Sequence, residues 1–244
     1  GTSQIANGFV NQCRLFSSRW MKADSLAGLR KDMQAMSKRD YASRVKLIAN
    51  PGSGDASEAT ARLELVTHSL MDLGLHVDVT LAHPVEEAVS IAKKAVKKGY
   101  STVIAMGGDG TISAVIRGIA GSDVHLGIIV AGTANNIAAS LGVPEDLQDA
   151  CALIASGRVR DLDLAQVSTR KKKKFIFFMV TTVGLTSTLF PDLKDAPHGD
   201  FSNLKEAFRN LIHAEPEPKI YLTLDDESKI KVESIMVTVT NTPL

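Results

Sequence analysis

The sequence has few cysteines, few aromatic residues and almost no net charge. Its two cysteines, Cys13 and Cys151, lie far apart without a CxxC pair or a zinc-binding histidine spacing, which favours two reduced thiols in an intracellular protein. Aromatic residues make up 5% of the 244 residues, and 28 basic residues nearly balance 27 acidic ones, for a formal net charge of +1. Nucleic-acid-binding proteins usually show a basic excess and aromatic side chains for base stacking, so the composition argues against that class.

Long apolar runs and several familiar catalytic motifs are missing as well. No uninterrupted apolar run approaches the roughly 20 residues that a transmembrane helix needs. The sequence contains no GxxxxGK[ST], no complete GxGxxG, no HExxH and no Gly-x-Ser-x-Gly. These absences exclude a Walker-type phosphate loop, give no support to a zinc protease or a serine hydrolase, and weigh against a dinucleotide-binding Rossmann site.

Strand and helix patterns alternate regularly through residues 44–157. Helical spacings follow the strands, and Pro84 and Pro144 are placed to begin two of the helices. The nearly continuous apolar segment 102–106 is typical of a strand that helices cover on both faces. Repeated β-α units predict an α/β fold with an open parallel sheet, in which ligands bind beyond the carboxyl ends of the strands. The strands are expected at residues 45–49, 75–81, 102–106 and 126–130.

The segments on either side of this region have different patterns. Residues 1–43 are polar-mixed and lack strand signals, and the apolar spacing of residues 20–37 predicts a helix, so this segment is interpreted as an N-terminal helical arm. A membrane-surface or partner-binding face and a plain docking helix both remain open for this arm. Residues 158–244 are predicted to form a second, β-rich domain with one helix near residues 201–213. Its strand-like runs cover residues 159–167, 174–183, 219–224 and 230–240.

Three of the predicted strands are each followed by a glycine-rich loop and then by a helix. The loops cover residues 50–54, 107–111 and 132–136. At such junctions the first backbone N–H groups of the helix lack partners, and glycine lets the backbone approach a phosphate closely. A single loop of this kind is often only a tight turn, but three at one edge of one sheet favour a phosphate-binding site.

Asp109 lies among the glycines of the second loop. A carboxylate there would repel a bound phosphate unless a metal ion lies between them or a hydroxyl gives up its proton to the carboxylate. This arrangement suits phosphoryl transfer, in which Mg²⁺ neutralises phosphate charge and a carboxylate accepts the proton of the substrate. Alternatively, Asp109 only caps a helix or a turn.

The three loop sequences, NPGSG at 50–54, GGDGT at 107–111 and GTANN at 132–136, resemble in order and spacing the signature loops of the diacylglycerol kinase catalytic domain. This family contains bacterial lipid kinases and is related to sphingosine and ceramide kinases. The resemblance implies an NAD kinase/diacylglycerol kinase-like nucleotide-binding domain over residues 44–157, followed by a partial β-sandwich over residues 158–244. It also implies transfer of the γ-phosphoryl group of ATP, with Mg²⁺, to the hydroxyl of a diacylglycerol-like lipid.

The same resemblance implies roles for individual residues. Asp109 is the acidic residue of its motif, as a Mg²⁺ organiser or as the catalytic base, and it belongs to the nucleotide site. Arg158 and Asp161 match residues of the family at the point where the chain passes from the first domain into the second. The residues expected to hold the ATP phosphates or line the nucleotide pocket are Asn50, Ser53, Gly54, Thr80, Gly107, Gly108, Gly110, Thr111, Thr133 and Asn135.

The sequence departs from the family pattern at several places. Asn136 stands where the family usually has aspartate, a change that keeps a helix-capping side chain but removes a charge. Residues 185–188 lack the acidic residue that many relatives place there. A later glycine-rich segment, an Asp-Asp-Gly-type metal motif and a late acidic base are also absent, so the chain is expected to be incomplete.

The leading interpretation is a cytoplasmic lipid kinase that reaches its lipid peripherally at a membrane surface, without a transmembrane segment and without a nucleic-acid partner. A homodimer remains open. The basic run at residues 170–174 suits an anionic membrane surface, or else it is a solvated hairpin turn beside a buried strand. Two other interpretations are an NAD kinase-like enzyme for a soluble substrate and a non-catalytic nucleotide- or lipid-binding pseudokinase.

Overall fold

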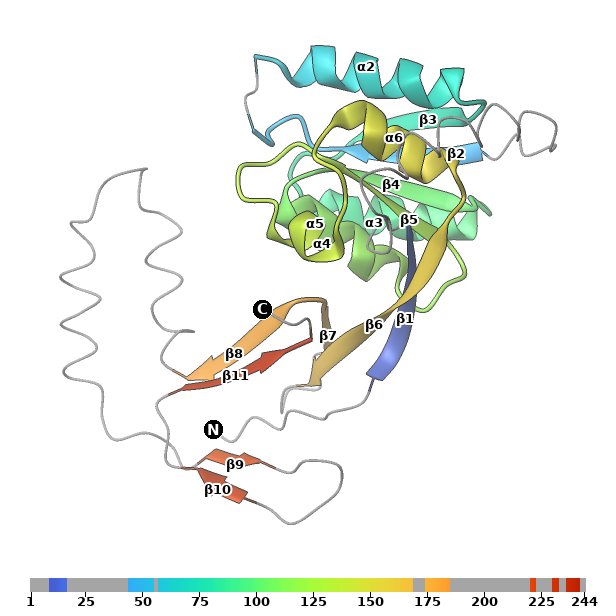
Figure 1. Cartoon of the computed structure of the whole chain (residues 1–244). Coiled ribbons are helices and arrows are strands. Elements are labelled where there is room, and N and C mark those ends of the chain that lie inside the picture. The colour runs from blue at the N-terminus through green and yellow to red at the C-terminus, as the bar shows by residue number, and fades with distance from the viewer. Residues whose placement is uncertain are drawn as a thin grey trace. The chain divides into compact units, whose positions relative to one another are not determined.

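The described residues of the computed structural model fall into two compact units, one within the range Val10–Leu164 and the other made of Phe9 and the described residues of the range Ala165–Pro243 (Figure 1). The predicted helices at residues 20–37 and 201–213, and residues 170–173 of the basic run, lie outside the described residues. No helix in the part of the chain that the structure describes is long and apolar enough to cross a membrane. The structure describes residues 9–16, 44–54, 57–168, 174–184, 220–222, 230–232 and 236–241.

The larger unit is built on the predicted open parallel sheet. Four strands lie in the order β3-β2-β4-β5, and each neighbouring pair is parallel. In register, Ile48 pairs with Thr80 on one side and with Ala105 on the other, so the carboxyl ends of the strands meet at one edge. This arrangement confirms the predicted α/β fold class. The four strands are β2 (Arg44–Ala49), β3 (His76–Leu81), β4 (Thr102–Gly107) and β5 (His125–Val130).

Helices cover both faces of this sheet. Helices α2 and α6 pack together over one face, and α3 and α4 pack together over the other (Figure 1). The close approach of α3 and α4 depends on Gly118, because a Cβ there would lie 2.5 Å from the Cβ of Ala92. The helices are α2 (Ala59–Asp72), α3 (Glu87–Lys97), α4 (Asp109–Ile119), α5 (Asn136–Leu141) and α6 (Leu147–Ala155).

The position of β4 in the core of the larger unit explains why its sequence is apolar at nearly every position. All six residues of β4 are buried, because successive side chains point to opposite faces and each face carries a helix layer. Ile104 and Met106 belong to the cluster beneath α2 and α6, where Val66 and Leu70 of α2 are fully buried. Burial of each such side chain contributes on the order of 1.5–3 kcal/mol. This layer holds the strand ends in place.

The helix boundaries follow local capping chemistry. Gly74 and Gly99 take positive φ just after α2 and α3, as expected for residues that end helices. The two prolines do not begin helices as predicted. Pro84 lies in a turn three residues before α3, and its carbonyl accepts from the N–H of Glu87. Helix α6 begins after Asp146, because its carboxylate accepts from the backbone N–H groups of Gln148 and Asp149, each at 2.9 Å.

One strand of the sheet was not expected from the sequence. Residues Phe9–Phe16 form β1, although the polar-mixed segment 1–43 was predicted to contain no strand. β1 pairs in parallel with β5, with Arg14 opposite His125 and Leu15 opposite Leu126. In the strand order, β1 lies between β5 and β6 (Val159–Ser168). The strand β1 therefore extends the parallel sheet beyond β5.

The smaller unit contains paired strands, as its sequence predicts. The last residues of β6 pair antiparallel with β7, β8 pairs antiparallel with β11, and β9 pairs antiparallel with β10. The expected single strand at residues 174–183 is divided by Phe178 and Met179. The β-sandwich and the boundary near Arg158 stay predictions. The strands are β7 (Lys174–Phe177), β8 (Val180–Gly184), β9 (Ile220–Leu222), β10 (Ile230–Val232) and β11 (Met236–Thr240).

Cys151 provides a chemical probe of this core. It is fully buried on α6, with Sγ 3.9 Å from the carbonyl oxygen of Val66, and burial raises the pKa of its thiol to about 12. Because the thiolate is the reactive form, alkylation of Cys151 at pH 8 is expected to be on the order of a thousandfold slower than that of a free cysteine. Peptide mass spectrometry after iodoacetamide treatment measures this rate. Equal labelling with and without denaturant would contradict the buried position.

Candidate functional site

The three glycine-rich loops meet at the carboxyl edge of the parallel sheet. The first loop (residues 50–54) follows β2, the second (107–111) runs from the last residue of β4 into the first turn of α4, and the third (132–136) follows β5. Backbone hydrogen bonds tie their bases together: Asn50 N–H donates to the carbonyl of Met106 at 3.0 Å, and Ala131 N–H donates to the carbonyl of Gly107 at 3.1 Å. The structure therefore brings the predicted loops to one place.

The first loop is shaped by Asn50. Its Oδ1 accepts from the N–H of Gly52 at 3.0 Å, and its Nδ2 donates to the Oγ1 of Thr111 at 3.4 Å in the second loop. The carbonyl of Ser53 accepts from Nη2 of Arg62 at 3.2 Å, which fixes a guanidinium of α2 behind the loop. Arg62 is not among the residues expected at this site from the sequence. Its place one turn into the helix that follows a glycine-rich loop was the available signal.

Glycines allow the loops to touch. Gly54 has φ +70°, and a Cβ there would lie 2.6 Å from the carbonyl oxygen of Ala131. A Cβ on Gly132 would lie 2.4 Å from the Cα of Gly108, closer than real Cβ contacts come. A Cβ on Gly107 would lie 2.5 Å from the Oγ1 of Thr111. These glycines are therefore required for packing between and within the loops, in addition to any role toward a ligand.

The start of α4 is the part of the edge that remains open to a ligand. The first intrahelical bond of α4 runs from Ile112 N–H to the carbonyl of Gly108, so the amides of Asp109, Gly110 and Thr111 precede it. A Cβ on Gly110 would have no neighbour within 4 Å. Such amides, together with the helix dipole, favour an anion. The side chain of Thr111 is buried, so Thr111 offers its backbone to this space.

Asp109 connects the second loop to the third. Its Oδ1 accepts from the N–H of Ile137 at 2.8 Å, and its Oδ2 accepts from the N–H and Nδ2 of Asn136 at 3.0 and 3.2 Å. The structure thus contains a capping contact of the kind considered from the sequence, although the capped helix is α5 rather than α4. Its role as a catalytic base or metal ligand stays a prediction.

The capping role expected for Asn136 is wrong, because its neighbour takes that position. Asn135 is the N-cap of α5 with φ 51°, and its side chain is engaged with Gly132 through bonds of 2.7 and 3.1 Å. Asn136 is the first residue of the helix, and Asp109 supplies the acceptor for its amide. Thr133 is exposed in the same loop. The third loop is therefore held by its own Asn135 and by Asp109 of the second loop.

Thr80, Arg158 and Asp161 occupy different places relative to this edge. Thr80 is half-buried, one residue before the end of β3, and the N–H of Ala82 donates to the carbonyl of Ala49 at 2.9 Å beside the first loop. Thr80 thus reaches the same edge as the three loops. Arg158 immediately precedes β6 and Asp161 lies on it, with both residues exposed.

The described residues do not form a protein-held magnesium site. Three of the about four lone-pair sites of the Asp109 carboxylate accept N–H donors. Among the residues that the structure describes, no group of three or more His, Cys, Asp or Glu side chains could hold a metal ion. Mg²⁺ at this edge would therefore depend on the phosphates of a bound nucleotide for most of its ligands.

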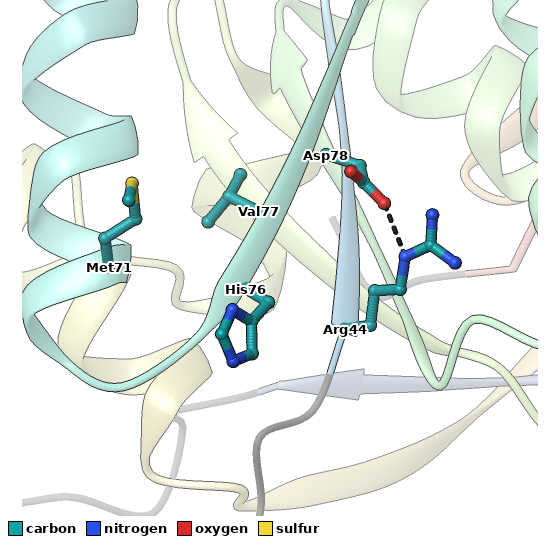
Figure 2. A pocket seen from close by; sticks show the side chains of 5 residues that line it. All are labelled: Arg44, Met71, His76, Val77 and Asp78. Atoms are coloured by element: carbon teal, nitrogen blue, oxygen red, sulfur yellow. Dashed lines mark hydrogen bonds and ion pairs between the residues drawn. The ribbon is translucent and has the colours of Figure 1, made fainter.

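A separate hollow of about 470 Å³ lies at the opposite edge of the sheet, at the amino ends of β2 and β3 (Figure 2). Nε of Arg44 donates to Oδ2 of Asp78 at 2.7 Å, and the hydroxyl of Tyr100 donates to the same oxygen. These two hydrogen bonds, first that of Tyr100, lower the pKa of Asp78. The hollow is thus bounded by an ion pair that joins strands and is remote from the loops. Its lining residues are Arg44, Met71, His76, Val77 and Asp78.

Comparison with known proteins agrees with the loop geometry. The chain is 33% identical over 155 residues to "Probable lipid kinase YegS" of Escherichia coli O127:H6, covering 61% of this chain and 50% of that protein. It is 34% identical over 128 residues to the diacylglycerol kinase of Bacillus subtilis, covering 51% of this chain and 42% of that protein. The match thus spans half or less of the length of these relatives.

The fold is shared with a solved structure as well. The crystal structure of a diacylglycerol kinase from Bacillus anthracis superimposes with a TM-score of 0.58 at 22% sequence identity, covering 82% of this chain and 64% of that one. The family model of the diacylglycerol kinase catalytic domain matches residues 44–167, about half of the chain, and includes all three loops. The chain therefore belongs to the diacylglycerol kinase catalytic domain family.

Proposed function

We propose that the protein is an ATP-dependent lipid kinase, which transfers the γ-phosphoryl group to the hydroxyl of a diacylglycerol-like lipid. The observation that carries this proposal is the convergence of three glycine-rich loops beside the open start of α4. Membership of a family whose relatives are named lipid kinase and diacylglycerol kinase supports the same reaction class.

The second loop would bind the nucleotide phosphates. The amides of residues 109–111 form the start of α4 and precede its first intrahelical bond, and the absence of any atom within 4 Å of a Cβ on Gly110 leaves room for a phosphate. The guanidinium of Arg62, held against the first loop, also lies 3.9 Å from the carboxylate of Glu58, which offsets part of its positive charge at this edge. The remaining residues proposed to line the nucleotide pocket are Asn50, Ser53, Gly54, Thr80, Thr133 and Asn135.

Catalysis would rest on positioning and on charge stabilisation, as is usual for phosphoryl transfer. Mg²⁺ bound together with the nucleotide would neutralise part of the negative charge of the phosphates. Amides at the start of α4 would hold the phosphates in line with the acceptor hydroxyl and are already fixed by the fold. Asp109 would act in this reaction as a catalytic base or as a metal ligand, or it would instead hold the loops in position.

The lipid would be met at a membrane surface. Family relatives with lipid kinase names support a lipid acceptor. Along the chain, the basic run at residues 170–174 follows β6, and its last residue, Lys174, begins β7, which pairs antiparallel with β6. Each basic residue near an anionic surface contributes roughly 1 kcal/mol of attraction. An NAD kinase-like activity has no counterpart among these relatives. A non-catalytic nucleotide- or lipid-binding protein is the remaining alternative, because Asn136 stands where the family usually has aspartate.

A labelling assay tests the proposed reaction. Purified protein, γ-labelled ATP, Mg²⁺ and vesicles containing diacylglycerol are expected to yield labelled phosphatidate that extracts into chloroform. A parallel reaction with NAD in place of lipid separates the soluble-substrate alternative, which would instead produce NADP. Tight ATP binding without labelled product across a broad lipid panel would contradict the lipid kinase and favour the non-catalytic alternative.

A further inference from the structure

The carboxylate of Asp109 is engaged more fully than a substrate-facing acid needs to be. Both oxygens accept hydrogen bonds, and all three donors come from the first two residues of α5, 27 and 28 positions further along the chain. Asp109 is itself the first residue of α4. One side chain therefore links the starts of two helices that follow neighbouring strands.

Asn136 determines the charge of this link. Its side-chain Nδ2 donates to Oδ2 of Asp109 at 3.2 Å, so the pair carries one negative charge, which faces the backbone amides of α5. A carboxylate at position 136 would place two negative charges at this separation. Such a pair needs a shared proton or a cation between its members. With asparagine at position 136, the contact with Asp109 needs neither a shared proton nor a cation.

The link also controls the contact between the loops. Gly108 and Gly132 approach so closely that a Cβ on Gly132 would lie 2.4 Å from the Cα of Gly108. Asp109 follows Gly108 directly, and Asn136 follows the turn that Asn135 closes onto Gly132. The hydrogen bonds of Asp109 therefore hold the second and third loops at the spacing that this glycine contact requires.

We propose that Asp109 is a positioning residue, which holds the second and third loops together as one nucleotide-binding surface, and that Asn136 lets this contact form without a metal ion. The proposal rests on the proposed function for its effect on ATP. The contact itself is a property of the fold and can be tested without any ligand.

Hydrogen exchange tests the contact directly. The amides of Asn136 and Ile137 are expected to exchange at least tenfold faster in Asp109→Ala than in the unaltered protein, because they lose their acceptors. Asp146→Ala is the matched control, since Asp146 also caps a helix with one carboxylate and two amides but joins no loops. It should accelerate exchange only at residues 148 and 149. Unchanged exchange at residues 136 and 137 in Asp109→Ala would overturn the proposal.

Thermal unfolding of the Asn136→Asp variant, with and without Mg²⁺, tests whether the contact between Asp109 and Asn136 forms without a metal ion. Two adjacent carboxylates repel each other, so this variant should be less stable than the unaltered protein. Its thermal midpoint is expected to be several degrees below that of the unaltered protein and to recover with millimolar Mg²⁺, which would lie between the two carboxylates. The unaltered protein should not respond to Mg²⁺. A Mg²⁺ response of equal size in both proteins would overturn the metal-free contact.

ATP affinity separates positioning from proton transfer. In calorimetric titration with a non-hydrolysable ATP analogue, Asp109→Ala is expected to bind at least tenfold more weakly, with Asn136→Ala intermediate and Asp146→Ala unchanged. A catalytic base predicts instead unchanged affinity with a lower kcat, and that result would overturn positioning. If the unaltered protein binds no ATP analogue, the proposed function fails, and the exchange measurement alone decides the contact.

Discussion

Replacement of Gly132 by alanine is expected to abolish measurable ATP binding and to lower the free energy of unfolding by about 1–3 kcal/mol. The added Cβ would meet the Cα of Gly108 at 2.4 Å and the Oδ1 of Asn135 at 2.8 Å. The backbone of Gly108 cannot rotate away from the added methyl group as a flexible side chain could. The second and third loops must therefore separate, which displaces the amides at the start of α4.

Gly110→Ala is the matched control for this experiment. Its Cβ would meet nothing within 4 Å, and Gly110 lies in α4, where alanine is favoured over glycine by roughly 0.8–1 kcal/mol. Chemical denaturation should show Gly110→Ala at least as stable as the unaltered protein, whereas calorimetry should show weaker ATP binding because the methyl group enters the open space. If Gly132→Ala equals the unaltered protein in both measurements, the loops do not depend on this contact.

Truncation of Ile104 to alanine is expected to lower the free energy of unfolding by about 2–5 kcal/mol. Ile104 is fully buried in the central strand β4, between β2 and β5, and belongs to the cluster beneath α2 and α6. Its removal leaves a cavity that the surrounding strands and helices can fill only in part. A loss of this size is a large share of the 5–15 kcal/mol that stabilises a typical domain.

The matched control is Val79→Ala on β3, whose side chain is 39% exposed on the edge strand of the parallel sheet. Urea denaturation followed by circular dichroism should detect a shift for Ile104→Ala several times that for Val79→Ala. ATP affinity of the folded fraction should change little in either variant, because both residues lie within strands and outside the three loops. Equal shifts for the two variants would mean that β4 is not the buried centre of the sheet.

The parallel sheet and its loops were predictable because their signals are local. A strand covered on both faces is apolar at every position, as in β4, and an amphipathic stripe marks the buried side of α2 at Val66 and Leu70. Glycine-rich segments after three such strands indicate where the chain turns sharply. Since parallel strands end at one edge, their order along the chain was sufficient to gather the loops there.

Features that depend on residues remote in the chain were not predictable. The strand β1 mixes apolar residues with Asn11, Gln12 and Arg14, so its own pattern does not distinguish it from a connecting segment. Its stability comes from pairing with β5. Likewise, the acceptor for the first amides of α5 is Asp109, which precedes that helix by a whole β-α unit. Local capping rules therefore assigned the wrong residue.

The place of β1 in the sheet has a consequence for how the chain acquires its fold during synthesis. Arg14 pairs with His125, so β1 must wait for a partner that is made more than a hundred residues later. The strands β2, β3 and β4 can pair over much shorter separations. Closing the longer loop costs more chain entropy and slows folding. The N-terminal strand thus joins the nascent sheet late, and until it does, β5 is left with an open edge.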